Sequence, residues 1–500
     1  MSQKVSPIVL PTIALSLMTV VSAVAGLNMA LPGIAVETEA TQTQLTWIVD
    51  SYTVVFAGLL LIAGAIGDRF GRQRILVSGL TIFAVGAIFG FYQTNPEGLI
   101  VARLIMGIGA AAIMPTTLSV ITTSFPPEKR GKAIGVWVGV AGGGAVLGLF
   151  ATAFLLEYFE WNSFFALNFG LAITSILGAL FVPNSSDEKI GRLDWFGGVL
   201  SVAAVGGIVF GIIEGPEQGW DSVESISGLL VGTLALVAFV IWELVAKNPL
   251  LDPRLFKLRG FSSGALSITI QFFGQFGFIF VGMQYLQFVA GFTPLEAALH
   301  LLWMPLVVLP GSRLAGALSK KVPQKILGGI GLAIFGYSLL HFSQLPVEFD
   351  YWYFTAGILM FGIGMSLSAT PATLAITSAL PNSKQGVASA VNDTSREVGS
   401  AVGIAILGAT LTDTYKSEMK SATEGLPLEI AEKLESSVAF TQLDAPAPLL
   451  QVWDGLVTSG LEAFNAGVQT SLTIAGWTAI VGAVLIAILA PSKVSEVDTN

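Results

Sequence analysis

Long apolar runs recur along the whole chain, and they constrain its fold more than any other feature. Each run is about 20 residues long, the length of an α-helix that crosses the hydrocarbon core of a bilayer. Because lipid offers no hydrogen-bond partner to the backbone, such runs are expected to be helical. The sequence therefore predicts an all-α polytopic membrane protein with fourteen transmembrane helices. The runs lie near 8–33, 45–66, 75–93, 98–122, 131–156, 162–182, 195–214, 226–245, 261–290, 294–318, 325–344, 352–377, 385–411 and 467–490.

The composition agrees with a chain that lies mainly in lipid. Hydrophobic residues make up 53% of the chain and charged residues only 11%, whereas soluble domains carry roughly 25% charged residues. Cysteine is absent, and the two histidines cannot build a metal cluster. The sequence shows no nucleotide loop, nucleophile triad or basic stripe. We therefore expect no enzyme activity, no metal and no nucleic-acid partner.

The loops between the runs differ in charge from one side of the membrane to the other. With 67–74 placed inside, most loop Lys and Arg fall on the inner side, and the outer loops hold only Lys416, Lys420 and Lys433. By the positive-inside rule, both termini are then cytoplasmic. The longest outer loop, 412–466, mixes acids with apolar residues at near-helical spacing. This pattern predicts an amphipathic helix on the outer surface, and a solvated cap without a role in transport is the alternative.

An internal repeat is visible in the sequence. Gly-Ile-Gly occurs at 107–109 and again at 362–364, and Pro-Thr-Thr-Leu at 115–118 corresponds to Pro-Ala-Thr-Leu at 371–374. The repeat is displaced by eight runs rather than six, so the simplest account is two six-helix bundles with two inserted helices. Such repeats are a transporter plan with the cargo site between the halves. The predicted segments are 1–185, 186–258 and 259–500, the last containing the external loop.

Residues 64–74 form a short, basic, glycine-rich break between two apolar runs. The segment Gly64-x-x-x-Asp68-Arg69-x-Gly71-Arg72-x-Arg74 resembles the signature loop of the major facilitator superfamily. The fourteen runs, Asn28-Met-Ala-Leu-Pro32, Trp47-Ile-Val-Asp-Ser-Tyr52 and Arg103-Leu-Ile-Met-Gly107 resemble its fourteen-span drug:proton antiporter family. The resemblance implies a major facilitator fold and export of lipophilic drugs in exchange for protons. The proton gradient would supply the energy, and no cofactor is expected.

The resemblance also implies that the 64–74 loop is a cytoplasmic gate. We expect Asp68 to lie against the amino end of the thirteenth run, near Asn382–Gln385. A carboxylate there meets the positive end of a helix dipole, an interaction worth about 0.3–1 kcal/mol. Such a contact can break and re-form as the halves rock. The alternative is that the loop only determines topology.

Ionisable residues inside predicted spans are candidates for proton coupling. Asp50 and Arg103 lie at comparable depth, and we expect them to pair or to compete for a proton. The resemblance implicates the arginine in proton transfer. Since arginine does not release its proton, it would act by tuning an acid. A static structural ion pair is the alternative.

Asp393, Arg396 and Glu397 lie near the middle of the membrane on the thirteenth run. Asp393 and Glu397 are four residues apart and share a helix face. Two adjacent carboxylates in a poor solvent do not both ionise cheaply, so we expect one to hold a proton while Arg396 pairs with the other. This group is the predicted proton site. The alternative is that the charges are neutralised for packing.

The ninth run interleaves Phe with Gln, which suits a lipophilic cargo that carries a few polar groups. Phe side chains that face lipid are the alternative. The residues expected to line the substrate cavity are Asn28, Tyr52, Phe272, Gln275, Phe276 and Asn392.

Two departures from the resembled family weaken the expectation of antiport and of a cationic drug. The segment Ser22–Gly26 has no acid before the Asn28 motif. In the fifth run, Leu149 replaces a proline, and Thr152 and Ala153 replace a glycine pair.

The sequence thus predicts a monomeric, proton-coupled exporter of small lipophilic compounds in the inner (plasma) membrane. Its partners would be the substrate, protons and the lipid bilayer, and transport would proceed by rocking of two six-helix bundles. The alternatives are a proton-coupled uptake or lipid-moving carrier on the same fold, and a membrane receptor or scaffold that does not transport.

Overall fold

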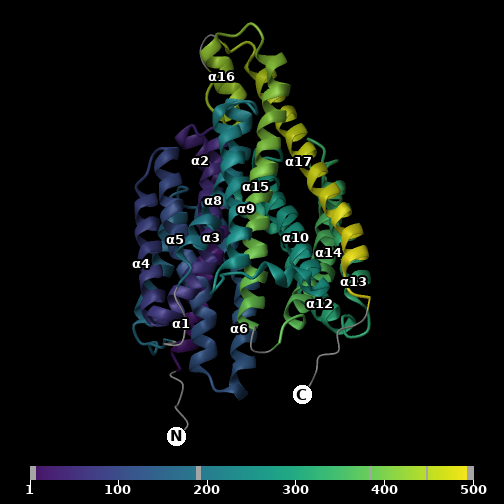
Figure 1. Ribbon diagram of the computed structural model, residues 1–500. Helices are drawn as coiled ribbons and strands as arrows, with labels where there is room; N and C mark the ends of the chain where they lie inside the picture. Colours follow the sequence, from purple (N-terminus) through teal and green to yellow (C-terminus); the bar gives the residue numbers. More distant parts are fainter. Residues whose placement is uncertain (1–6, 187–192, 382–384, 446–448, 493–500) are drawn as a thin grey trace. The chain divides into compact units, whose positions relative to one another are not determined.

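The computed structural model describes residues 7–186, 193–381, 385–445 and 449–492. Every regular element within these ranges is a helix, which confirms the predicted all-α class. Figure 1 labels most of the helices. Their bounds are α1 (Val9–Ala25), α2 (Leu27–Thr38), α3 (Gln42–Phe70), α4 (Arg72–Phe91), α5 (Pro96–Ser124), α6 (Pro127–Leu156), α7 (Ser163–Ala179), α8 (Trp195–Gln218), α9 (Val223–Val245), η1 (Pro253–Lys257), α10 (Arg259–Gln284), η2 (Tyr285–Val289), α11 (Pro294–His300), α12 (Trp303–Leu318), α13 (Gln324–Phe342), α14 (Tyr351–Ser378), α15 (Gln385–Thr423), α16 (Leu428–Ser436), η4 (Val438–Gln442) and α17 (Trp453–Leu489).

Most of these helices are suited to a bilayer. Ten of the helices in the described ranges are long and apolar enough to cross a membrane, or up to eleven if the bent pair α1–α2 is one span. The remaining predicted spans coincide with α6, α7 and α15, which fall outside that set. The chain is therefore a multi-pass membrane protein, and the exact count of fourteen spans stays a prediction.

The helices form two compact units. The first comprises Met1–Ile34, Trp47–Ile208 and Leu230–Leu250, and the second comprises Ala35–Thr46, Val209–Leu229 and Leu251–Asn500. Each of the helices α8 and α9 is divided between the two units. The three-segment division predicted from the sequence stays a prediction.

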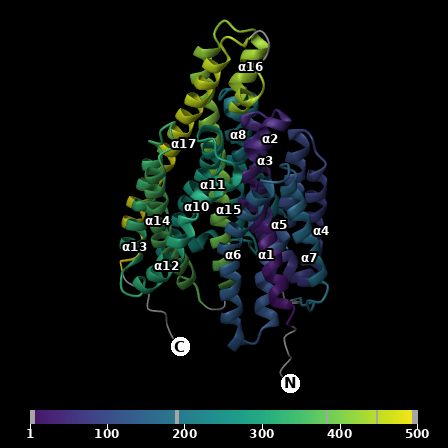
Figure 2. The same ribbon diagram turned by 180° about the vertical axis from the view of Figure 1, so that it is seen from behind.

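The two units share one packing scheme. In the first unit α4 packs against α5 and α7, and α1 packs against α5, α6 and α7, as the view from behind in Figure 2 shows. In the second unit α13 packs against α14 and α17, and α10 packs against α14, α15 and α17. The order of partners is the same in both, as expected for an internal repeat.

The repeated Gly-Ile-Gly segments allow this packing. A Cβ atom at Gly109 of α5 would lie 2.6 Å from the carbonyl oxygen of Gly79 on α4. At Gly364 of α14, an added Cβ would overlap the backbone of Phe335 on α13. Glycine is required at both positions because the backbones of paired helices approach closely there.

The external segment predicted at 412–466 is more helical than expected. The helix α15 continues to Thr423 and α17 already begins at Trp453, and α16 lies beside their ends in both views (Figures 1 and 2). The hydroxyl of Tyr415 donates to the carbonyl of Leu434 at 2.8 Å, and Leu434 is buried. The helix α15 therefore continues beyond the apolar run that was predicted to end at residue 411, since packing against α16 supports it there, and the end of the membrane span itself stays a prediction.

Candidate functional site

The 64–74 motif connects α3 to α4 through a single residue. Gly71 has a φ of 109°, in the left-handed region that favours glycine. A Cβ atom there would also lie 2.7 Å from Oδ1 of Asn184. The tight turn lets α4 begin at Arg72, immediately after α3 ends at Phe70.

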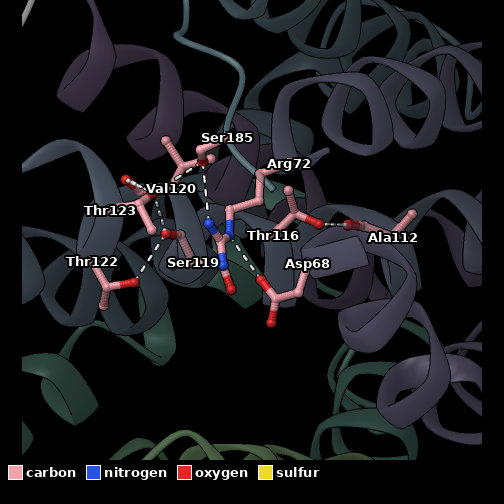
Figure 3. Close-up of polar contacts among 9 residues, drawn as sticks. All are labelled: Asp68, Arg72, Ala112, Thr116, Ser119, Val120, Thr122, Thr123 and Ser185. Atoms are coloured by element: carbon pink, nitrogen blue, oxygen red, sulfur yellow. Dashed lines mark hydrogen bonds and ion pairs between the residues drawn. The ribbon is translucent and has the colours of Figure 1, made fainter. Parts of the chain in front are cut away.

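Arg72 is the centre of the polar contacts in this motif. Its Nε donates to Oδ1 of Asp68 at 2.7 Å and its Nη1 donates to Oγ of Ser185 at 3.2 Å, as Figure 3 shows. Its backbone N–H donates to the carbonyl of Ser185 at 2.9 Å. The Ser185 hydroxyl lies 3.3 Å from Oγ1 of Thr123, in the last turn of α5. The motif is thus tied to α5 and to the segment after α7.

The predicted gate contact of Asp68 is not among these interactions. Its expected partner near Asn382–Gln385 includes residues 382–384, which lie outside the described residues. The gate therefore stays a prediction. Arg69 and Arg74 are exposed, and the Arg69 guanidinium lies 5.6 Å from the ring centre of Phe70.

Arg103 is fully buried and connects α5 to α1 and α3. Its Nε donates to the carbonyl of Ile48 on α3, and its Nη1 donates to the carbonyl of Ala23 on α1, both at 3.2 Å. The guanidinium stands 4.1 Å from the ring centre of Tyr52, a cation–π contact. All of these partners are uncharged, so Arg103 is held by carbonyl dipoles and an aromatic face.

The break between α1 and α2 explains why these donors are needed. The two helices meet at a 46° bend, so the last carbonyls of α1 lose their intrahelical partners. Arg103 donates to Ala23, and the Asn28 amide lies 3.2 Å from the carbonyl of Val24 and 3.5 Å from that of Ala25. The two side chains cap the broken helix, and a cation beside a helix C-terminus is favourable.

The predicted cavity residues of the first unit lie within this packing. Asn28 is 2% exposed and Tyr52 is fully buried, with its hydroxyl donating to the carbonyl of Val20 at 3.2 Å. Both side chains stabilise the end of α1. Their contact with a substrate stays a prediction.

Asp50 and Arg103 do not form the predicted ion pair. Asp50 is fully buried and its Oδ1 accepts from Oγ1 of Thr53 at 2.6 Å. Residues two apart on a helix point about 200° apart. Asp50 therefore projects from the side of α3 opposite to Tyr52, whose ring contacts Arg103. The predicted ion pair between Asp50 and Arg103 is therefore wrong. A role of either residue in proton coupling stays a prediction.

The second group of embedded charges lies on α15. Nη1 of Arg396 is 3.9 Å from Oδ1 of Asp393, and the guanidinium stands 4.7 Å from the ring centre of Phe272 on α10. Oδ1 of Asn392 accepts from Oγ1 of Thr373 on α14 at 3.1 Å. Glu397 follows Arg396 and is partly buried. The structure thus places Arg396 against α10 and the neighbouring Asn392 against α14.

The aromatic residues of α10 mostly face protein. Phe272 is 8% exposed and stacks on Phe276 with ring centres 5.8 Å apart. Phe278 is 1% exposed and stacks on Phe342 at 4.6 Å. Gln275 is 8% exposed. The alternative in which these rings face lipid is wrong for Phe272 and Phe278, whereas a substrate contact stays a prediction.

Residues 13–404 match the sequence profile of the Major Facilitator Superfamily, which is more than half of the chain. The chain belongs to this superfamily. As a member of this superfamily, the protein is a membrane transporter. The family match gives no indication of catalytic activity.

Two curated relatives of this major facilitator transporter cover most of its length. It is 31% identical over 388 residues to the multidrug resistance protein Stp of Mycobacterium tuberculosis, covering 77% of this chain and 72% of the relative. It is 31% identical over 471 residues to the multidrug efflux pump LfrA of Mycolicibacterium smegmatis, covering 92% of each.

A solved structure confirms the fold. The chain is similar to a bacterial homolog of the human lysosomal transporter Spinster, in an inward-facing and unoccupied conformation. The TM-score is 0.64 at 18% identity, covering 97% of this chain and 99% of the other. The predicted major facilitator fold is thereby confirmed.

The sequence-based prediction of this transporter's site missed a polar contact between α10 and α14. Oγ of Ser368 lies 2.6 Å from Oε1 of Gln271, and both residues are fully buried. The available signal was the regular spacing of Ser263, Ser267, Gln271 and Gln275 along an otherwise apolar run. Polar residues four apart share one helix face, so this spacing indicates a polar stripe.

Proposed function

We propose that this transporter exports small lipophilic compounds in exchange for protons, as a member of the fourteen-span drug:proton antiporter family. The similarity to LfrA, a multidrug efflux pump, over 92% of both chains supports drug export. The shared packing scheme of the two units supports alternating access. We further propose a monomer in the plasma membrane with cytoplasmic termini, in line with the loop charges.

The proposal of proton coupling rests on the group formed by Asp393, Arg396 and Glu397 on α15. An isolated charge in a low-dielectric interior costs several kcal/mol, so a buried carboxylate is stable when it is paired or protonated. Arg396 lies 3.9 Å from Asp393 and is next to Glu397 in sequence. One cation beside two acids leaves one carboxyl group to take up and release a proton. That exchange would couple the membrane pH gradient to the conformation of α15.

Transport into liposomes tests this proposal. The purified protein would be reconstituted, a pH gradient imposed, and the movement of a fluorescent lipophilic cation such as ethidium recorded. We expect Glu397→Gln and Asp393→Asn to lower gradient-driven transport at least tenfold. Glu418→Gln serves as the matched control, because Glu418 is exposed on the same helix.

Two results would contradict the proposal at different points. Full gradient-driven transport by both variants would show that the proton site lies elsewhere. A wild-type protein whose transport ignores the gradient would exclude proton coupling. In inverted vesicles, the direction of movement distinguishes export from uptake.

A further inference from the structure

Four helices of the first unit have one end that belongs to the second unit. The second unit includes Ala35–Thr46 and Val209–Leu229, which hold the end of α2, the beginning of α3, the end of α8 and the beginning of α9. The remainder of each of these helices belongs to the first unit. In the proposed topology all four of these ends lie on the outer side of the membrane. A rocking transporter has to release such contacts when it opens to the outside.

One set of contacts joins α15 to the ends of α3 and α8. Nζ of Lys416 on α15 lies 3.8 Å from Oε2 of Glu217 on α8 and donates to the carbonyl of Pro216 at 3.2 Å. Oγ1 of Thr43, in the first turn of α3, donates to the same Glu217 oxygen at 3.2 Å. The side chains of Lys416 and Glu217 are only 28% and 32% exposed. Glu217 thereby links three helices through one carboxylate.

A second ion pair joins α16 to the turn between α2 and α3. Nζ of Lys433 lies 3.0 Å from Oε2 of Glu39. Glu39 has a φ of 50°, in the left-handed region that side chains seldom adopt, and it is the only non-glycine residue with a positive φ among those that the structure describes. Such a backbone conformation persists where surrounding contacts hold it. The ion pair with Lys433 is one of these contacts.

The beginning of α3 is rigid and packs closely on α15. The backbone N–H of Thr41 donates to Oε1 of Gln44 at 2.9 Å, and the N–H of Gln44 donates to Oγ1 of Thr41 at 3.1 Å, the reciprocal pattern of a capping box. Thr46 is 1% exposed, and a Cβ atom at Gly408 of α15 would lie 2.7 Å from its Oγ1. A movement of the α2–α3 turn is therefore passed on to α3.

On the other side of these contacts, α16 is attached to α15. The hydroxyl of Tyr415 donates to the carbonyl of Leu434, and Oγ1 of Thr423 donates to Oε1 of Glu435. Both bonds join the end of α15 to α16. The two lysines, one on each of these helices, are therefore expected to move together.

We propose that Lys416 and Lys433 latch the outer side of the transporter shut by pairing with the acids at the end of α8 and in the α2–α3 turn. Opening to the outside breaks both ion pairs, and closing re-forms them. Partly exposed ion pairs each change an equilibrium constant by about fivefold or less, so the latch can open in every cycle. The external segment 412–466 then acts in transport and is more than a solvated cap. This inference rests on the proposed alternating access and is independent of proton coupling.

The reactivity of a thiol at position 46 tests the latch. The chain contains no cysteine and Thr46 is buried, so a maleimide reacts with Thr46→Cys only when α3 separates from α15. In purified protein the reagent reaches both faces, so the result does not depend on topology. Adding Lys416→Gln and Lys433→Gln together should raise the labelling rate roughly threefold or more, because the open state becomes more populated.

Two controls accompany the labelling. Lys420→Gln removes the same charge from an exposed position on α15 and should leave the rate unchanged. Glu39→Lys or Lys433→Glu alone should raise the rate, and the two together should return it towards that of the wild type. Equal rates for the double glutamine variant, Lys420→Gln and the unchanged chain would overturn the latch. A rate that stays high when the charges are exchanged would show that they do not act as a pair.

Cross-linking tests whether the latch has to open. A bifunctional methanethiosulfonate reagent would join Glu39→Cys to Lys433→Cys, and we expect transport to fall about tenfold or more and to recover when a reducing agent cleaves the link. The matched control joins Thr423→Cys to Glu435→Cys, which links α15 to α16 on one side of the latch and should leave transport unchanged. Transport that persists in the cross-linked Glu39–Lys433 pair would overturn the proposal.

The labelling also separates this inference from the proposed function, since it needs neither substrate nor a pH gradient. If wild-type transport ignores the gradient but the expected labelling pattern is found, proton coupling fails and the latch stands. If transport follows the gradient while the lysine variants label like the unchanged chain, the latch alone is contradicted.

Discussion

At the level of single residues, the contacts of Arg103 are specific to a guanidinium. Two of its nitrogens donate to carbonyls on different helices, and a lysine has only one nitrogen. Arg103→Lys should leave one buried carbonyl unpaired and lower the free energy of unfolding by about 1–3 kcal/mol. This loss would be seen as a lower melting temperature in detergent.

Arg259 serves as the control. It also donates to two carbonyls, those of Leu489 and Ile488, but it is exposed. Water replaces its bonds, so Arg259→Lys should change little. Equal losses at both positions would contradict a capping role for Arg103.

The same residue shows how much of the site the sequence could predict. A charge within an apolar run marks Arg103 as important, and the sequence alone supports that conclusion. Its partners depend on the break between α1 and α2 and on which side of α3 faces α5. Both are set by packing, so the predicted pairing with Asp50 was wrong. Asp393 and Arg396, three apart on one helix, could be paired from the sequence because the helix itself fixes their separation.

At the level of helices, the repeated glycines make a prediction that separates packing from helix propensity. A Cβ at Gly364 would overlap the backbone of Phe335, whereas the nearest atom to a Cβ at Gly316 is 3.9 Å away. Gly364→Ala should therefore lower the melting temperature by several degrees. Gly316→Ala should leave it unchanged or raise it, since alanine is favoured over glycine in a helix by about 1 kcal/mol. An unchanged melting temperature for Gly364→Ala would contradict the close packing of α13 and α14.

The hydrophobic pattern determines where most helices lie, so their positions can be predicted from the sequence. The ends of the helices are harder to predict. The repeat at 107–109 and 362–364 correctly indicated equivalent helices, since close backbone contact requires glycine in both. The extension of α15 to Thr423 was missed because it depends on contacts such as Tyr415 with Leu434. An apolar window marks the part of a helix that lies in lipid and carries no information on where the helix ends in water.

At the level of the whole molecule, topology is the prediction on which the direction of transport depends, and the chain offers a clean test of it. It contains no cysteine, so a single introduced thiol is the only one that a reagent can label. Lys129 and Glu160 are exposed near opposite ends of α6, whose 30 residues span about 45 Å. The topology proposed from the positive-inside rule places Lys129 inside and Glu160 outside. A membrane-impermeant maleimide should label Glu160→Cys but not Lys129→Cys in intact cells, and it should label both variants in permeabilised cells.

Labelling of both variants in intact cells would show that α6 does not cross the membrane. Labelling of Lys129→Cys alone would invert the proposed topology. The expected pattern would show that α6 crosses the membrane and so test one of the fourteen predicted spans directly.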